Sequence, residues 1–282
     1  MVIQMICASN SQIFVLVHGA WHGNWTFFRL QSRLENAGNT VININLPGHG
    51  LDKTPAGNVT LADYSNAIVQ VLDTLNEQVV LVGHSMGGIA ISMAAEARPN
   101  KIDKLVYLAA FMPKNGESML DLALQDSLSQ IGPSLIFDFP NNVVDLRREK
   151  IGDIFYDSYT APYVYLSEML LTPNPLQPIV TPLTLTVENY GSVRRFYIAT
   201  NLDQAITPDF QEYMYTEQPC EEVFYINSSH SPFFSHPTRL KKILTRIAND
   251  SILNAPAIPI EHKQKMKNID GFTFLNFISN SS

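Results

Sequence analysis

"VVLVGHSMGG", residues 79–88, decides the fold of this 282-residue chain. Its first half is an apolar run of the kind that forms a strand buried on both faces. Its second half places Ser85 between Gly83 and Gly87, and the small residues that follow predict a helix. A serine on so sharp a strand-to-helix turn has a strained backbone and needs neighbours without bulky side chains. The stretch therefore predicts a nucleophile elbow at the carboxyl end of a central strand.

Short apolar runs alternate with helix-like segments along the chain, as in a parallel sheet covered by helices. The predicted strands are residues 13–19, 40–46, 79–83, 104–110, 194–200 and 222–227. The segments with a helical spacing of apolar residues are 25–37, 61–76, 86–97 and 236–248. This alternation predicts an α/β fold.

The alternation breaks between Met112 and Ser192, where the chain is rich in Pro, Tyr, Leu and Met and contains the irregular stretch "TPNPLQPIVTP". An insertion of this length within an α/β domain is usually functional. We therefore expect a core made of residues 1–111 and 193–249, with residues 112–192 forming a cap. The composition changes again at residue 250, so residues 250–282 are expected to form a C-terminal appendage of unknown role.

Composition and charge limit the partners of this protein. A formal net charge of -7 argues against nucleic acid and anionic membranes, and favours a small neutral or apolar ligand. The two cysteines, Cys7 and Cys220, fit neither a disulfide framework nor a metal site. We find no secretory signal and no apolar run of membrane-spanning length, so the expected location is the cytoplasm. No nucleotide, metal or flavin signature is present, and no cofactor is expected.

A nucleophilic serine needs a base, which follows it in chain order on this kind of elbow. Three histidines follow Ser85, namely His230, His236 and His262. His230 lies in a loop directly after the last predicted strand, whereas His236 precedes a predicted helix and His262 lies in the appendage. We therefore predict that His230 is the base.

The base needs an acid to orient it, and the segment after strand 194–200 offers two. Asp203 lies close to the end of the strand, whereas Asp209 follows Pro208 and is typical of the first turn of a helix. We predict that Asp203 is the acid. The alternatives after the preceding strand are Asp121, Asp126 and Asp138.

Two backbone amides are expected to bind the oxyanion. The first belongs to Met86, the residue after the nucleophile, and the second to Ala20 in the loop "HGAWHGNW", residues 18–25. A metal site is disfavoured, because the histidines of this region have no Asp or Glu beside them in the sequence and no metal-binding spacing. The residues predicted to line a mostly apolar pocket, because they adjoin these loops, are Trp21, Phe111 and Phe233. Together these parts predict hydrolysis of small esters through an acyl-enzyme.

Five ordered blocks extend the pattern beyond the serine motif. They are "FVLVHGAWHGNWTF", "VVLVGHSMGG", "LVYLAAFMP", "GSVRRFYIATNLDQAITPDFQ" and the His230 loop. From about residue 12 to residue 249 the chain resembles the α/β-hydrolase branch that contains plant methylesterases, the salicylic-acid-binding methylesterase among them, and plant hydroxynitrile lyases. The resemblance implies a mostly parallel eight-stranded sheet flanked by helices, with a helical cap inserted after the sixth strand. It also implies a triad of Ser85, Asp203 and His230, and a possible homodimer.

The resemblance leaves more than one activity open. Hydroxynitrile lyases of this branch use a threonine in the early loop and a lysine beside the catalytic histidine. Here these positions are Gly19 and Ser231, and neither can supply a cation for cyanide release. We therefore favour a carboxylesterase, with a hydroxynitrile lyase as one alternative. A ligand-binding receptor or effector that retains the triad is the other. The loop "SSHSPFF" and the appendage depart from the family pattern.

Overall fold

The structure is a computed structural model that describes residues 11–156 and 161–250. Its described residues up to Asn249 belong to one compact unit. Cys7 and the predicted appendage lie outside the described residues, except for Asp250.

Six parallel strands form the central sheet, in the order β2-β1-β3-β4-β8-β9. They are β1 (Ile13–Val17), β2 (Thr40–Ile44), β3 (Val79–His84), β4 (Ile102–Leu108), β8 (Arg194–Thr200) and β9 (Glu222–Ile226). All six predicted strands are present, and every residue of β3 is buried as its apolar run requires. The strand count implied by the family resemblance was eight, and the described residues supply six.

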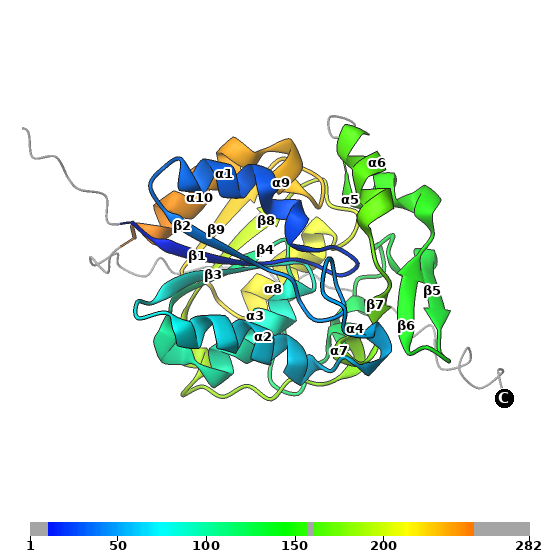
Figure 1. The fold of residues 1–282 in the computed structure, drawn as a ribbon, viewed down its shortest axis with the longest axis horizontal. Helices are drawn as coiled ribbons and strands as arrows, with labels where there is room; N and C mark the ends of the chain where they lie inside the picture. Colours follow the sequence, from blue (N-terminus) through cyan, green and yellow to red (C-terminus); the bar gives the residue numbers. More distant parts are fainter. Residues whose placement is uncertain (1–10, 157–160, 251–282) are drawn as a thin grey trace, which may run out of the picture. The chain divides into compact units, whose positions relative to one another are not determined.

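Helices cover both faces of this sheet (Figure 1). Helices α1 (Phe28–Glu35) and α10 (Pro237–Ala248) lie on one face, and α2 (Leu61–Thr74) and α3 (Gly87–Ala97) on the other. These correspond to the four predicted helices. Helix α2 begins at Thr60, whose side chain accepts a hydrogen bond from the Asp63 amide in a capping box. The other helical elements of the core are η1 (Asn24–Phe27), η2 (Ala56–Asn58), η3 (Pro99–Lys101), η7 (Tyr190–Ser192), α8 (Pro208–Glu217) and α9 (Pro232–Ser235).

The strand order reverses direction at β1. The chain passes from β1 to β2 on one side of the sheet and returns to β3 on the other side of β1. In open α/β sheets, ligands bind at such a switch point, outside the carboxyl ends of the strands. The loops that follow β1 and β3 are therefore the ones most favourably placed for chemistry.

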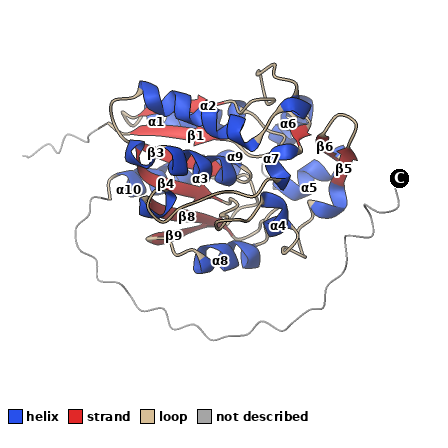
Figure 2. Cartoon of the chain, turned by 90° about the horizontal axis from the view of Figure 1, so that it is seen from below, coloured by secondary structure: helices blue, strands red, loops and turns tan. Residues whose placement is uncertain are grey.

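The cap is not purely helical, which corrects one expectation. It contains an antiparallel sheet in the order β5-β6-β7, and it follows the fourth strand of the main sheet in chain order rather than the sixth. Its elements are α4 (Met119–Ala123), η4 (Gly132–Ser134), β5 (Leu135–Asp138), β6 (Val143–Leu146), η5 (Arg148–Lys150), α5 (Ile151–Phe155), α6 (Ala161–Leu170), β7 (Asn174–Pro175) and α7 (Gln177–Val180). The α5, α6, β5 and β6 segments lie together at one end of the main sheet (Figures 1 and 2).

The cap sheet escaped prediction because its strands are very short and one of them contains a proline. A turn with Asn142 in the left-handed region, at a φ of 54°, connects β5 to β6. Strand β7 has only two residues, and its Pro175 occurs where sequence patterns indicate irregular chain.

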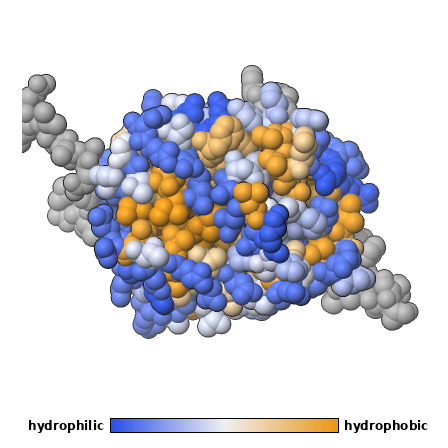
Figure 3. All heavy atoms as spheres, in the orientation of Figure 1, coloured by the Kyte–Doolittle hydropathy of each residue, from blue (hydrophilic) through white to orange (hydrophobic). Residues whose placement is uncertain are grey.

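Apolar residues reach the surface in several places. On the face shown in Figure 3 they gather in patches that polar residues separate. Folded proteins expose much apolar surface, so this exposure by itself assigns no function. Among the described helices, none combines the length and the apolar character that crossing a membrane would need.

The start of α3 packs against the loop after β4 without room for a side chain. A Cβ on Gly88 would lie 2.0 Å from the Phe111 carbonyl oxygen, which is backbone and cannot move aside cheaply. Glycine at this position lets the helix approach the sheet closely.

We predict that Gly88→Ala lowers the free energy of unfolding by about 1–3 kcal/mol, because the added methyl group forces α3 away from the loop. Urea denaturation would measure the loss. Gly132→Ala is the matched control, since a Cβ there has no atom within 4 Å. Equal stabilities of the two variants would contradict this account of the packing.

Candidate active site

Ser85 lies on the strained turn that the sequence predicts. Its φ is 54°, a left-handed conformation that is rare for residues with a side chain. The Ser85 amide donates to the Leu108 carbonyl (3.3 Å), and the Ser85 carbonyl accepts from the amides of Gly88 (3.0 Å) and Phe111 (3.1 Å). These backbone bonds hold the turn in its strained shape.

Close approach explains the small neighbours of Ser85. A Cβ on Gly83 would lie 2.7 Å from the Gly87 carbonyl oxygen, and a Cβ on Gly87 would lie 2.7 Å from the Val17 carbonyl oxygen. Each distance is shorter than a real Cβ contact. The elbow therefore fits between β1 and its own strand only with glycine at both positions.

The register of the sheet determines which loops meet at the elbow. Val17 of β1 pairs with Gly83 of β3, so the loop after β1 begins beside the elbow. Thr200 of β8 pairs with Ile226 of β9, so the two loops that follow these strands also begin side by side. Because all these strands are parallel, their carboxyl ends meet at one edge of the sheet.

The loops after β8 and β9 bring together Asp203 and His230. His230 Nδ1 donates a hydrogen bond of 2.7 Å to Asp203 Oδ2, and both side chains are buried. A carboxylate can only accept here, so the neutral ring carries its proton on Nδ1 and its lone pair on Nε2. The imidazole is therefore oriented as a base.

Asp203 is held by four further donors. Its Oδ1 accepts from the amides of Ala205 (2.8 Å) and Ile206 (3.0 Å). Its Oδ2 accepts from Thr200 Oγ1 (2.7 Å) and from Gln211 Nε2 (3.1 Å). Gln211 lies on α8 and is completely buried. The carboxylate is thus fixed in place by its own loop and by the following helix.

The alternative acids have other partners. Asp126 accepts from the amide (2.7 Å) and the hydroxyl (2.6 Å) of Thr207 at the start of α8, and burial raises its pKa. Asp209 lies in the first turn of α8, as predicted. Two more acids bind within the cap, Asp121 in the capping box with Ser118 and Asp138 with the side chain of Asn141. None of the four contacts His230 through a hydrogen bond among the described residues.

His84 connects His230 to the elbow. Its Nε2 donates to the His230 carbonyl (2.9 Å), and the two ring centroids are 4.6 Å apart. His230 Nε2 is buried, and neither it nor Ser85 Oγ forms a hydrogen bond to any described residue. Catalytic hydrogen bonds are often long in ligand-free structures and tighten when substrate binds.

The two amides predicted to bind an oxyanion lie on either side of this junction. Within the described residues, neither the Ala20 nor the Met86 amide donates a hydrogen bond. Gly19 brings the loop of Ala20 against the elbow, since a Cβ on Gly19 would lie 2.8 Å from Ser85 Cβ. Two free amides beside a serine can stabilise a developing negative charge.

Four further histidines are buried around the elbow, at positions 18, 22, 49 and 84. Burial lowers the pKa of His18 to about 4 and that of His22 to about 3. Their hydrogen bonds suit neutral rings, since His18 donates to the Gly19 carbonyl and accepts from the Leu46 amide. Within residues 11–156 and 161–250, no group of potential ligands is placed to hold a metal ion.

The residues predicted to line a pocket are all buried. The Trp21 indole donates to the Val144 carbonyl of the cap (2.9 Å). The Phe111 amide binds the Ser85 carbonyl, and the Phe233 ring packs edge-on against His84 at 4.9 Å. Contact of these three side chains with a substrate stays a prediction.

Sequence reasoning missed two residues that contact the proposed base and acid. Phe155, at the end of α5, places its ring 5.6 Å from that of His230, and Gln211 binds Asp203 as described above. Neither residue belongs to a recognisable motif. The "DFQ" at the start of α8 was the nearest signal, because polar residues in a helix that follows the acid loop can turn back toward it.

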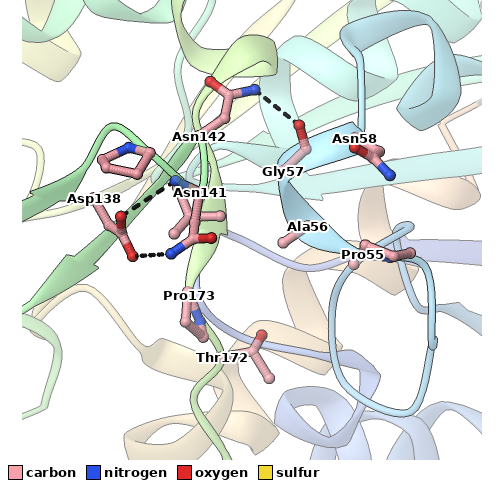
Figure 4. A pocket seen from close by; sticks show the side chains of 12 residues that line it. Pro55, Ala56, Gly57, Asn58, Asp138, Asn141, Asn142, Thr172 and Pro173 are labelled. Atoms are coloured by element: carbon pink, nitrogen blue, oxygen red, sulfur yellow. Dashed lines mark hydrogen bonds between the residues drawn. The ribbon is translucent and has the colours of Figure 1, made fainter.

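A groove of about 570 Å³ occurs elsewhere, between the core loop at residues 55–58 and the cap (Figure 4). The Asn142 side chain donates to the Gly57 carbonyl across it (2.9 Å). Its lining includes Asp138 and Thr172 but no histidine, cysteine or lysine. The groove therefore offers a carboxylate and a hydroxyl but no histidine beside them, unlike the elbow region.

We predict that stability falls in acid as the buried histidines are forced to protonate. An unfolded histidine binds its proton near pH 6.5, whereas folded His18 does so only near pH 4, so stability present above pH 6.5 is lost as the pH falls toward 4. The loss from His18 is of order 3 kcal/mol. Urea denaturation of the wild type and of His18→Asn should therefore give stabilities that converge between pH 7 and pH 4.5. Parallel pH profiles would contradict the prediction.

Comparison with known proteins agrees with this fold. The model of the alpha/beta hydrolase family matches residues 14–242. "Putative methylesterase 15, chloroplastic" of Arabidopsis thaliana is 36% identical over 254 residues, which cover 85% of this chain but only 57% of that protein. "Methylesterase 7" of the same plant is 30% identical over 260 residues, or 86% of this chain and 98% of the relative. The crystal structure of polyneuridine aldehyde esterase superposes with a TM-score of 0.74 at 28% identity, covering 85% of this chain and 100% of that one.

These matches include nearly the whole of the described core and cap, although the chain spans little more than half of methylesterase 15. The predicted family resemblance is confirmed. This chain belongs to the alpha/beta hydrolase family, in the branch that contains the plant methylesterases.

Proposed function

We propose that this protein is a serine carboxylesterase that hydrolyses small esters through an acyl-enzyme intermediate. The observation that carries the proposal is the buried hydrogen bond between His230 Nδ1 and Asp203 (2.7 Å), which leaves Nε2 buried without a partner among the described residues, in a loop that His84 binds next to Ser85. The names of the relatives, methylesterase and esterase, support the same class of reaction.

In the proposed first step, His230 Nε2 takes the proton of Ser85 Oγ as that oxygen attacks the ester carbonyl carbon. The amides of Ala20 and Met86 bind the negative oxygen of the tetrahedral intermediate. When the intermediate collapses, the bond to the alcohol breaks and His230 returns the proton to the departing oxygen. Asp203 keeps the imidazole in its reactive tautomer and stabilises the imidazolium that forms.

Water completes the cycle by the same route. His230 removes a proton from a water molecule, the resulting hydroxide oxygen attacks the acyl carbon, and Ser85 Oγ leaves with the proton held by His230. The products are a carboxylic acid and regenerated enzyme. No cofactor or metal takes part in these steps.

The surroundings of the proposed triad favour an apolar substrate. The Phe155 ring packs against His230, the Phe111 amide binds the Ser85 carbonyl, and Trp21 directly follows Ala20 in the chain. Aromatic walls with a few polar groups suit small or medium acyl and alcohol parts. Methyl esters are an attractive class, because two of the relatives compared above carry the name methylesterase.

The hydroxynitrile lyase alternative remains disfavoured. A Cβ on Gly19 would lie 2.8 Å from Ser85 Cβ, so a threonine there would require the loop to move. Ser231, next to the proposed base, is a buried hydroxyl and offers no cation for a leaving cyanide. No contact among the described residues specifically favours a receptor or effector role.

Location and assembly remain proposals as well. We propose a cytoplasmic protein that acts on a small molecule and not on nucleic acid, and that forms a homodimer as the family resemblance implies. Methylesterase 15 is named chloroplastic, so fractionation of cells against plastid markers is the direct test of location. Analytical ultracentrifugation would test the dimer.

We predict that the wild type hydrolyses p-nitrophenyl acetate and that Ser85→Ala lowers kcat by at least about 10³-fold, because the nucleophile is removed. Ser92→Ala is the matched control, since Ser92 is a buried serine of the following helix that binds Tyr107 and Gly88. A fluorophosphonate probe should label the wild type and the control but not Ser85→Ala. Ester hydrolysis that survives in Ser85→Ala would overturn the proposal.

The choice of acid can be tested by a pair of amide variants. Asp203→Asn should lower kcat by about 10³–10⁴-fold, because the amide favours the wrong tautomer of His230. Asp126→Asn should stay within about threefold of the wild type, since that residue binds Thr207 and not the imidazole. Steady-state kinetics would show a reversed order if Asp126 were the acid.

A further inference from the structure

Trp21 joins the core to the cap through every polar group that it has. Its amide donates to Asn174 Oδ1 (3.3 Å), and its indole N–H donates to the Val144 carbonyl (2.9 Å). Its carbonyl accepts from the Thr172 amide (3.0 Å). All three partners belong to the cap, although Trp21 itself lies in the loop after β1.

The backbone of Trp21 is strained. Its φ is 60°, so a bulky aromatic residue occupies the left-handed region that normally favours glycine. Such a conformation costs about 1–3 kcal/mol and persists only where the surroundings enforce it. The three hydrogen bonds to the cap, together with the near-complete burial of the side chain, are those surroundings.

The strained residue directly follows Ala20, whose N–H, in the preceding Gly19–Ala20 peptide group, is the proposed oxyanion donor. The peptide group that joins Ala20 to the strained residue is held at both ends, since its carbonyl accepts from His22 Nδ1 (2.7 Å) and its N–H binds Asn174. His22 in turn accepts from the hydroxyl of Tyr156, another cap residue (2.7 Å). The N–H of this peptide group therefore binds a cap residue directly, and its carbonyl is connected to the cap through His22 and Tyr156.

Asn174 is well suited to hold this peptide. It is completely buried, and its Nδ2 donates to the Pro175 carbonyl (2.8 Å), which leaves Oδ1 directed at the Trp21 amide. A side chain without this oxygen would leave a buried N–H without a partner, which is costly.

We propose that Trp21 and Asn174 are positioning residues for the oxyanion site, so that docking of the cap sets the orientation of the Ala20 amide toward Ser85. The inference rests on the proposed esterase function and deepens it. The cap then does more than cover the substrate, because the loop keeps its strained, productive shape only while the cap is hydrogen-bonded to it.

Two variants test the coupling without touching the triad. Trp21→Phe removes the indole N–H, and Asn174→Leu removes the acceptor for the Trp21 amide. We expect kcat for p-nitrophenyl acetate to fall by about 10-fold or more in each, with KM changed by less than about threefold, because an oxyanion donor acts in the transition state. Titration with a fluorophosphonate counts the folded active sites, so partial misfolding is separated from slower chemistry.

The readout specific to the oxyanion site is the ratio of rates for p-nitrophenyl acetate and its thionoester, in which sulfur replaces the carbonyl oxygen. Sulfur is a poor hydrogen-bond acceptor, so an intact oxyanion site favours the oxygen ester strongly. The ratio should fall toward that of uncatalysed hydrolysis in both variants. A merely structural loss would lower both rates together and leave the ratio unchanged.

Two controls match these variants. Trp25→Phe removes an indole N–H that is buried without a hydrogen-bond partner among the described residues. Asn142→Gly removes a different hydrogen bond between cap and core, the one to Gly57 across the groove of Figure 4, and retains the left-handed turn. Both controls should keep the wild-type rate ratio, even if Asn142→Gly is less stable.

The outcomes separate this inference from the proposed function. Absence of ester hydrolysis and of Ser85 labelling in the wild type would contradict both. An active wild type with unchanged kcat and rate ratio in Trp21→Phe and Asn174→Leu would contradict only the coupling of cap to loop. An equal fall of the ratio in the controls would also contradict it.

Discussion

The left-handed turn at Ser85 is the constraint on which the rest of the structure depends. The backbone of β1, β3, α3 and the loop after β4 approaches so closely around it that no side chain fits at Gly83, Gly87 or Gly88. This close approach brings the loop of Ala20 against the serine and frees the Met86 amide at the start of the helix. The geometry that makes the serine accessible to a base thus also places the two amides beside it.

The parallel arrangement of the strands brings together the acid and the base of the site. Because neighbouring strands end at the same edge of the sheet, short loops after β8 and β9 are enough to bring Asp203 to His230. Helix α8 then holds the carboxylate through Gln211. Several buried, neutral histidines lie around this point. They lower the stability of the fold at acid pH, because each would have to take up a proton away from water.

Many hydrogen bonds join the cap to the core, and three sets of them lie near the loop after β1 and the groove of Figure 4. Trp21 binds three cap residues, His22 binds Tyr156, and Asn142 binds Gly57. The first two connections meet at the loop that carries the proposed oxyanion amide.

The sequence alone predicted the six strands, the four main helices, the elbow and the choice of Asp203 and His230, because periodicity and glycine spacing are local signals and the acid and base of such an elbow follow the serine in chain order. It did not determine the cap sheet, whose strands have only two to four residues and one of which, β7, contains a proline. Nor did it indicate the roles of Phe155, Asn174 and Gln211, or the strained backbone of Trp21. These depend on contacts between segments far apart in the chain, and only the tertiary structure decides which distant groups become neighbours.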